Sequence, residues 1–242
     1  MTYPIIRTIA AMLLLCSLFF QVPAQTMQVI YEESRTQSET SKEGLEPWMR
    51  QVLENNNNSH LWQLTYLEGR SLYKTAGDKQ STKTVNNFHE KYKVYRDMGA
   101  HEVLKVSPML SGDFLVQATP DQIDAKWQLV PGTKQIGDYT CQKATTIRPD
   151  TGAEVTAWYT AQIPSPTGPD VYWGLPGLIL HVDIVGKNST THITALSVVY
   201  DSDEALYPEK PDFGKPITYG DYQKIVKKEK SGIAMFSDPF GQ

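Results

Sequence analysis

The sequence YWGLPGLIL, residues 172–180, joins an aromatic pair to a Pro-Gly turn and then to a run of residues that favour β-structure. Pro176 presets φ for the second position of a turn, and Gly177 supplies the positive φ that a type II turn requires next. Residues 178–185 are therefore predicted to leave this turn as a strand. No side chain of the stretch is a nucleophile, an acid, a base or a metal ligand, so it predicts architecture rather than chemistry.

The signature within this stretch is formed by Gly174, Leu175, Pro176, Gly177, Leu178 and Ile179. GDYTCQKA (137–144), AWYT (157–160), IP (163–164) and GP (168–169) precede it along the chain. In this order the motifs resemble the GLPGLI family, which consists of secreted proteins of Gram-negative bacteria, and the resemblance extends over residues 125–185. Members of this family are often encoded beside outer-membrane receptor-like proteins, so the resemblance implies a role in the cell envelope, and it assigns no catalytic residue.

The composition indicates one globular, β-rich domain. The chain has 242 residues, of which 40% are hydrophobic, and this is enough for one domain with a sizeable core. Its net charge of −4 and pI near 5.7, without a basic stripe, argue against nucleic-acid binding. Tyrosine is common, with 13 residues, and segments of alternating polarity outnumber helical ones.

The first 24 residues have the pattern of a signal peptide. Arg7 precedes the apolar run 9–20, and Val22 and Ala24 provide small residues before a cleavage site. The run is shorter than the roughly 20 residues that a membrane-spanning helix needs. We therefore expect cleavage after Ala24, a mature domain over 25–242 without a transmembrane span, and a periplasmic or secreted protein.

The two cysteines have different expected fates. Lipid attachment at Cys16 is disfavoured because the large Leu15 precedes it and the apolar run continues after it. Removal of residues 1–24 leaves Cys141 as the one cysteine of the expected mature chain, so it has no partner there for a disulfide. We expect Cys141 to be a buried, unreactive strand residue, because no histidine lies near it in sequence.

Periodicity predicts about ten antiparallel strands in one strongly curved sheet or open half-barrel, with two short peripheral helices. The predicted helices cover 44–58 and 222–230, and residues 201–216 are predicted to form a loop. The predicted strands cover 27–32, 61–67, 71–74, 92–95, 103–106, 114–118, 126–130, 139–146, 155–162, 178–185 and 191–200.

One group of residues could bind a metal. A hairpin of 178–185 and 191–200 closed by residues 185–188 places His181 opposite His192, and Asp183 on the same face. Two imidazoles and a carboxylate are suitable ligands for zinc or copper. The alternative is a solvated polar face opposite Leu180, Val182 and Ile184.

Two further groups have both a functional and a structural interpretation. Trp158, Tyr159, Tyr172 and Trp173 could form an aromatic platform for a sugar or peptide, or could pack in the core. Asp201, Asp203 and Glu204 could contribute to glycoside hydrolysis, or could belong to an acidic loop.

Because no catalytic motif or cofactor signature is present, the expected function is non-catalytic. We expect a periplasmic accessory protein that binds an apolar small molecule or a partner in the envelope. The alternatives are a hydrolase whose site is assembled only in three dimensions and a structural interaction module. A ligand-sized cavity favours binding, convergent polar groups with shifted pKa values favour an enzyme, and an exposed apolar patch favours an interaction module.

Overall fold

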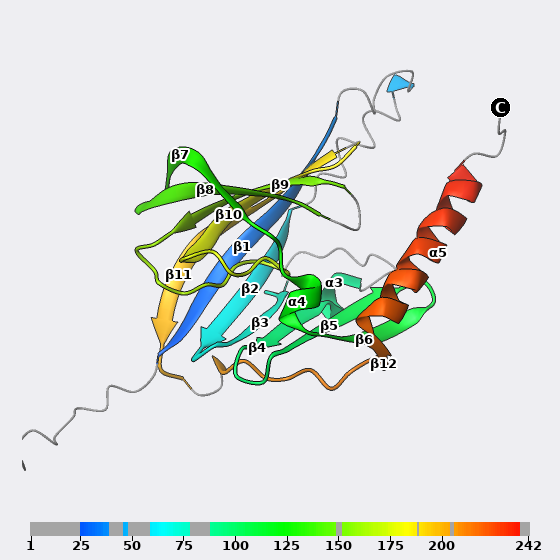
Figure 1. Cartoon of the computed structure of the whole chain (residues 1–242), viewed down its shortest axis with the longest axis horizontal. Coiled ribbons are helices and arrows are strands. Elements are labelled where there is room, and N and C mark those ends of the chain that lie inside the picture. Colours follow the sequence, from blue (N-terminus) through cyan, green and yellow to red (C-terminus); the bar gives the residue numbers. More distant parts are fainter. Residues whose placement is uncertain are drawn as a thin grey trace, which may run out of the picture.

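A computed structural model describes residues 25–38, 46–47, 59–77, 88–148, 152–187, 189–203 and 206–237. Twelve strands form one open sheet in the order β12-β6-β5-β4-β3-β2-β1-β11-β10-β9-β8-β7 (Figure 1). The strands are β1 (Thr26–Gln37), β2 (His60–Leu67), β3 (Arg70–Thr75), β4 (Lys93–Asp97), β5 (Glu102–Met109), β6 (Gly112–Ala118), β7 (Gln128–Ile136), β8 (Tyr139–Ile147), β9 (Glu154–Thr160), β10 (Leu178–Val185), β11 (Ser189–Asp201) and β12 (Lys215–Thr218).

The prediction of a mainly β protein with an open, curved antiparallel sheet is confirmed, and each predicted strand corresponds to an observed one. The predicted loop 201–216 is wrong at its end, because Lys215 and Pro216 begin β12, which pairs in parallel with β6. The predicted end of a strand at residue 130 is also wrong. The β7 strand continues past Pro131 and Gly132 through an irregularity in its pairing with β8, which accommodates a proline that lacks an N–H for the ladder.

The two faces of the sheet have different surroundings. We call the face that packs against residues 161–177 the inner face, and the opposite face the outer face. The main core lies on the inner face, where β1 contributes Val29 and Tyr31 and the covering segment contributes Tyr172 and Leu175, all fully or almost fully buried. Because side chains alternate along a strand, Glu33 follows Val29 and Tyr31 on this same face.

The segment 161–177 is fastened to the sheet by backbone and side-chain hydrogen bonds. The N–H of Leu178 donates to the carbonyl of Ile163 at 3.0 Å, and the buried hydroxyl of Tyr31 donates to the carbonyl of Ile179 at 2.7 Å. The predicted type II turn is wrong. The N–H of Gly177 instead donates to the carbonyl of Leu175 at 2.8 Å, so the turn spans three residues, and Gly177 has φ 151°.

Among the described residues, three helices accompany the sheet: α3 (Phe88–Lys91), α4 (Pro120–Ile123) and α5 (Tyr219–Ser237). The α5 helix contains the predicted helix 222–230 and is longer than predicted, whereas the predicted helix 44–58 lies largely outside the described residues. Among the helices described, none is both long and apolar enough to cross a membrane. Figure 1 shows α5 beside the end of the sheet that carries β5, β6 and β12.

Candidate functional site

The inner face of the sheet carries two adjoining cavities. We call the larger one, with a volume of about 730 Å³, the outer cavity, and the smaller one, with about 450 Å³, the inner cavity. Both names refer to cavities on the inner face. Both are lined by Lys105 of β5, Arg148 at the end of β8 and Tyr222 of α5, so these three residues mark their junction. The larger volume lies within the range of about 300–1,000 Å³ that is typical of small-molecule sites.

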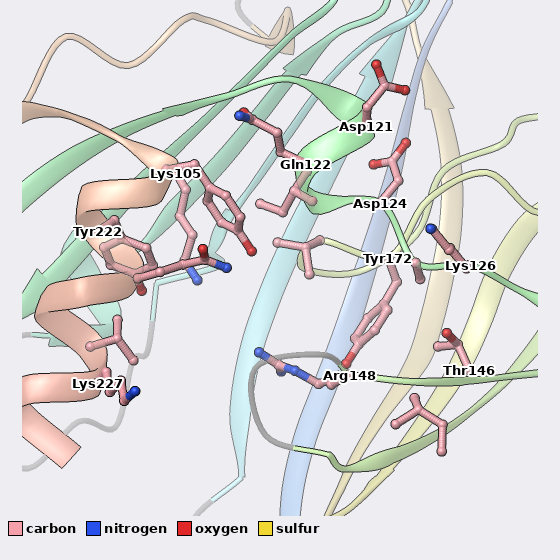
Figure 2. A pocket seen from close by; sticks show the side chains of 17 residues that line it. Lys105, Asp121, Gln122, Asp124, Lys126, Thr146, Arg148, Tyr172, Tyr222 and Lys227 are labelled. Atoms are coloured by element: carbon pink, nitrogen blue, oxygen red, sulfur yellow. The ribbon is translucent and has the colours of Figure 1, made fainter. Parts of the chain in front are cut away.

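The outer cavity lies between α5, the α4 segment and the segment 161–177. Figure 2 shows Tyr222 and Lys227 of α5 on one side of this cavity, with Tyr172 and Arg148 across from them. Apolar and aromatic side chains form much of its wall: Ile123, Ala125, Ile147, Val171, Tyr172, Tyr219, Tyr222 and Val226. Such a wall favours the apolar part of a ligand, because burying apolar surface is favourable.

Basic side chains outnumber acidic ones around the outer cavity. The basic residues are Lys105, Lys126, Arg148 and Lys227. Of the two carboxylates, Asp121 lies 3.3 Å from the Nε2 atom of His101, and Asp124 forms an ion pair with the buried Arg96. Because Asp124 is already paired with a cation, the outer cavity has an excess of positive charge, which favours an anionic group on a ligand.

Lys105 lies at the junction of the two cavities. Its Nζ atom is 5.2 Å from the ring centroid of Tyr92 and 5.6 Å from that of Tyr222. In the described part of the chain Lys105 makes these ring contacts and no ion pair. The Tyr222 hydroxyl is held by the Ser107 hydroxyl at 3.0 Å, so this part of the junction is fixed by α5 and β5 together.

The inner cavity contains two carboxylates close enough to influence each other. It is lined by Glu33 of β1 and by Asp170 of the segment 161–177. Burial raises the pKa of Glu33, and the negative charge of Asp170 raises it further. The Trp62 indole N–H partly opposes this effect, although it does not reach normal hydrogen-bond geometry. Glu33 is therefore a group that retains a proton to higher pH than an exposed glutamate.

Two tyrosines complete the polar wall of the inner cavity. The Tyr92 hydroxyl donates to a carboxylate oxygen of Asp170, and burial together with this carboxylate raises the pKa of Tyr92. The Tyr73 side chain is only 2% exposed, and its hydroxyl has no hydrogen-bond partner among the described residues. A buried hydroxyl without a partner is costly, so a polar ligand atom in this cavity would satisfy it.

The segment 161–177 explains why Asp170 lies in this position. Asp170 has φ 55°, a left-handed conformation that aspartate tolerates better than most residues. Just before it, Gly168 packs so closely on Ile179 that a Cβ atom would lie 2.7 Å from the Ile179 Cβ. The close approach places the start of this turn against β10 and directs Asp170 toward β4, where Tyr92 meets it at the edge of the strand.

The four aromatic residues of the predicted platform are not brought together. Trp158 and Tyr159 are neighbours on β9 and therefore point to opposite faces, with Tyr159 buried on the inner face. Trp158 contacts Lys134 and Lys143. The Trp173 ring is 5% exposed and contacts Arg96, so it belongs to the core. Of the four, Tyr172 lines the outer cavity.

The structure brings the predicted metal-binding residues together, but not in the predicted register. Asp183, not His181, is opposite His192, and His181 is opposite Thr194. The pairing of the two strands is thus shifted by two residues relative to the prediction. The hairpin is closed by Gly186, whose N–H donates to the carbonyl of Ser189, and not by residues 185 and 188. A shift of two keeps every side chain on its predicted face.

The three side chains share one carboxylate oxygen. Asp183 Oδ1 lies 2.9 Å from His181 Nε2 and 2.6 Å from His192 Nδ1. Burial lowers the pKa of His181, although Asp183 opposes this effect. Burial raises the pKa of Asp183, but the hydrogen bond from His192 and the contacts with His181 outweigh it, so the pKa lies below its usual value.

Cys141 is completely buried, on a strand, as expected. Burial raises the pKa of its thiol to about 11, although the nearby Lys134 acts in the opposite direction. The thiolate form that reacts with electrophiles is therefore scarce at neutral pH.

Of the predicted acidic loop, Asp201 ends β11 and Asp203 follows it, while Glu204 lies outside the described residues. Neither of these two aspartates lines the cavities.

Residues 149–181 match the family Porph_ging, described as a protein of unknown function. A search of curated proteins found no match. Two structures of PNGF-II have a similar fold: the one in space group C2 gives a TM-score of 0.52 at 15% identity, covering 85% of this chain and 33% of PNGF-II, and the one in P21 gives 0.53 at 15%, covering 85% and 34%. The chain thus spans about a third of PNGF-II, and this similarity shows the fold alone.

Sequence reasoning missed the inner cavity, although two signals pointed to it. Glu33 continues the alternation of the buried Val29 and Tyr31, which predicts a carboxylate on the buried face of β1. Asp170 follows Gly168 and Pro169 directly, in a segment where turn residues fix the backbone. That the two carboxylates meet depends on the path of segment 161–177 across the sheet, which local patterns do not specify.

Proposed function

We propose that this protein is an exported, non-catalytic binding protein that holds a small amphipathic ligand against the inner face of its sheet. The apolar wall of the outer cavity receives the body of the ligand, and an acidic group of the ligand lies near Lys105 and Arg148. The observation that carries this proposal is the cavity of about 730 Å³, with an apolar wall and an excess of basic side chains. Its volume and mixed lining are those of a site that binds one small molecule.

The compartment and the family form part of this proposal. The signal-peptide pattern of residues 1–24, which lie outside the described residues, supports export to the periplasm or beyond. The GLPGLI signature at 174–179 lies inside the matched stretch 149–181 and supports membership of the GLPGLI family. In this proposal an outer-membrane receptor-like protein receives the ligand. Intact-mass measurement of the secreted protein tests the cleavage site, and the expected mass is that of a chain that begins at Gln25.

Two fluorescent probes of similar shape test the binding site. Anilinonaphthalene sulfonate has an apolar ring system and a negative charge, and N-phenyl-1-naphthylamine has nearly the same rings without the charge. We expect one molecule of each probe to bind per chain. Ala125→Trp, which fills the outer cavity, should weaken both probes at least tenfold, whereas Lys105→Gln should weaken only the anionic probe.

The matched control is Leu196→Trp, which adds the same ring system at a site that is 57% exposed and lies outside the cavities. Urea unfolding of each variant checks that the probe reports on a folded protein, because expanded states also bind such dyes. Equal binding of both probes to the wild type and to Ala125→Trp would overturn the proposal.

One observation favours a second candidate function, a hydrolase. Glu33 and Asp170 converge in the inner cavity, and the raised pKa of Glu33 suits a general acid, whereas Asp170 is held by Tyr92. Hydrolysis of a nitrophenyl glycoside, ester or phosphate that is abolished by both Glu33→Gln and Asp170→Asn would favour this function. A panel without turnover, together with tight probe binding, favours the binding protein.

A further inference from the structure

We propose that His181, Asp183 and His192 form a binding site for a divalent transition-metal ion of the zinc or copper type on the outer face of the sheet. Ile184 and Thr191 line the inner cavity, so the alternating positions Asp183 and His192 point to the outer face. Each of the three side chains offers one ligand atom, and these atoms lie within 4.8 Å of one another. The site is thus separate from the proposed ligand cavity.

The distances permit a metal ion after a small movement. In a tetrahedral zinc site with bonds of about 2.0–2.1 Å, neighbouring ligand atoms lie about 3.3 Å apart. Asp183 Oδ1 now lies 2.9 Å from His181 Nε2 and 2.6 Å from His192 Nδ1. Moving the carboxylate outward by about half an ångström brings these two oxygen–nitrogen separations close to that value. Torsions of the Asp183 side chain allow this without any change in the strands.

A second observation, independent of the three ligands, points to the same use. His181 presents Nε2 to Asp183 while its other ring nitrogen, Nδ1, lies 2.7 Å from the hydroxyl of Thr194. Histidines that bind metals almost always donate this other N–H to an oxygen atom, which fixes the ring. The hydroxyl of Thr194 can accept as well as donate, so it serves both the metal-free and the metal-bound tautomer of His181.

The site is accessible to a metal ion and to a further ligand. The side chains of His181, Asp183 and His192 are 11%, 28% and 34% exposed, so solvent reaches the cluster from the outer face. Three protein ligands with an open position for water are the arrangement of catalytic rather than structural zinc sites. A strand pair supplies all three, and β10 and β11 are central strands of the sheet, which makes their spacing rigid.

Isothermal titration of the purified protein with zinc chloride tests the site. We expect one zinc ion per chain, bound at least tenfold more weakly by Asp183→Asn and by His192→Gln. Thr194→Ala should weaken binding about tenfold, and Thr194→Ser should restore it, as expected for a residue that orients His181. The matched control is His101→Gln, because His101 is exposed and also pairs with an aspartate, but has no second histidine beside it among the residues that the structure describes.

Copper(II) gives a second readout that does not depend on affinity. Its electron paramagnetic resonance spectrum should show coupling to two nitrogen nuclei, reduced to one in His192→Gln. Since His192 is partly exposed, this variant should fold, and its urea unfolding checks this point. Absence of zinc binding, or binding unchanged by His192→Gln, would show that the cluster is a hydrogen-bonded structural group. Neither result bears on the inner-face cavity.

Discussion

Replacing Gly177 by alanine places a methyl group where the backbone of the neighbouring strand already lies. A Cβ atom built on Gly177 would be 2.0 Å from the carbonyl oxygen of Thr160 and 2.7 Å from its carbonyl carbon. Cβ atoms essentially never approach another atom closer than 3.0 Å, so the backbone at residue 177 or at Thr160 must move by at least 1.0 Å. The clash involves backbone, which has no alternative rotamer.

The cost of this movement can be built from three terms. The φ of 151° at Gly177 is unfavourable for alanine by about 1 kcal/mol. Displacing Thr160 disturbs its pairing with Leu178, and each lost hydrogen bond costs about 1 kcal/mol. Overpacking of a dense region adds roughly 1–3 kcal/mol. We therefore expect Gly177→Ala to lower the free energy of unfolding by about 3–5 kcal/mol, the sum of these terms.

Gly174→Ala is the matched control within the same motif. Gly174 has φ 91°, but a Cβ atom there would have no neighbour within 4 Å. Its substitution should therefore cost only the conformational term, about 1 kcal/mol. Urea unfolding of both variants, compared at the same dependence of the free energy of unfolding on urea concentration, gives the difference in their stability. If the two variants agree within about 1 kcal/mol, the close contact between Gly177 and Thr160 does not exist and the account of this turn is wrong.

Three further predictions follow from buried groups. Cys141 should resist iodoacetamide at pH 7 in the folded protein and react fully after unfolding, because the pKa of its thiol is about 11; fast labelling of the folded state would contradict this. Because burial raises the pKa of Glu33, the folded state holds that proton more tightly, so stability falls as pH rises above 4.5, and Glu33→Gln should reduce this fall in urea midpoints. Asp124→Ala leaves the buried Arg96 without its ion pair and should lower the free energy of unfolding by about 2 kcal/mol, against about 0.5 kcal/mol for Arg70→Ala at an exposed pair. Similar losses in the two variants would show that burial of Arg96 does not strengthen its ion pair.

The strands of this fold could be predicted from the sequence because each has a local signal. Alternating residues around Val29 and Leu64, bounded by turn residues, specify where the chain forms a strand and which of its faces is buried. The short β12 strand was missed because it contains Pro216 and is held by its parallel partner β6, not by its own pattern. The register of the β10–β11 hairpin was missed because a loop without an Asn-Gly type signal does not fix its own length.

The candidate site was less predictable than the fold, because its residues come from distant parts of the chain. The inner cavity unites Glu33 of β1, Tyr92 near β4 and Asp170 of the covering segment, which are far apart in sequence. Gly177 was correctly predicted to need glycine, but the reasons are its close contact with Thr160 of the neighbouring strand and its positive φ, not a type II turn. Such contacts depend on how segment 161–177 crosses the inner face.

The central claim is that a small amphipathic molecule occupies the cavity on the inner face. The most direct measurement is native mass spectrometry of the protein isolated from its own cell envelope, in parallel for the wild type and for Ala125→Trp. The account predicts one bound small molecule per wild-type chain, with an acidic group in its fragmentation spectrum, and none on Ala125→Trp. A wild-type chain that carries no small molecule, or the same molecule bound equally to both forms, would contradict it.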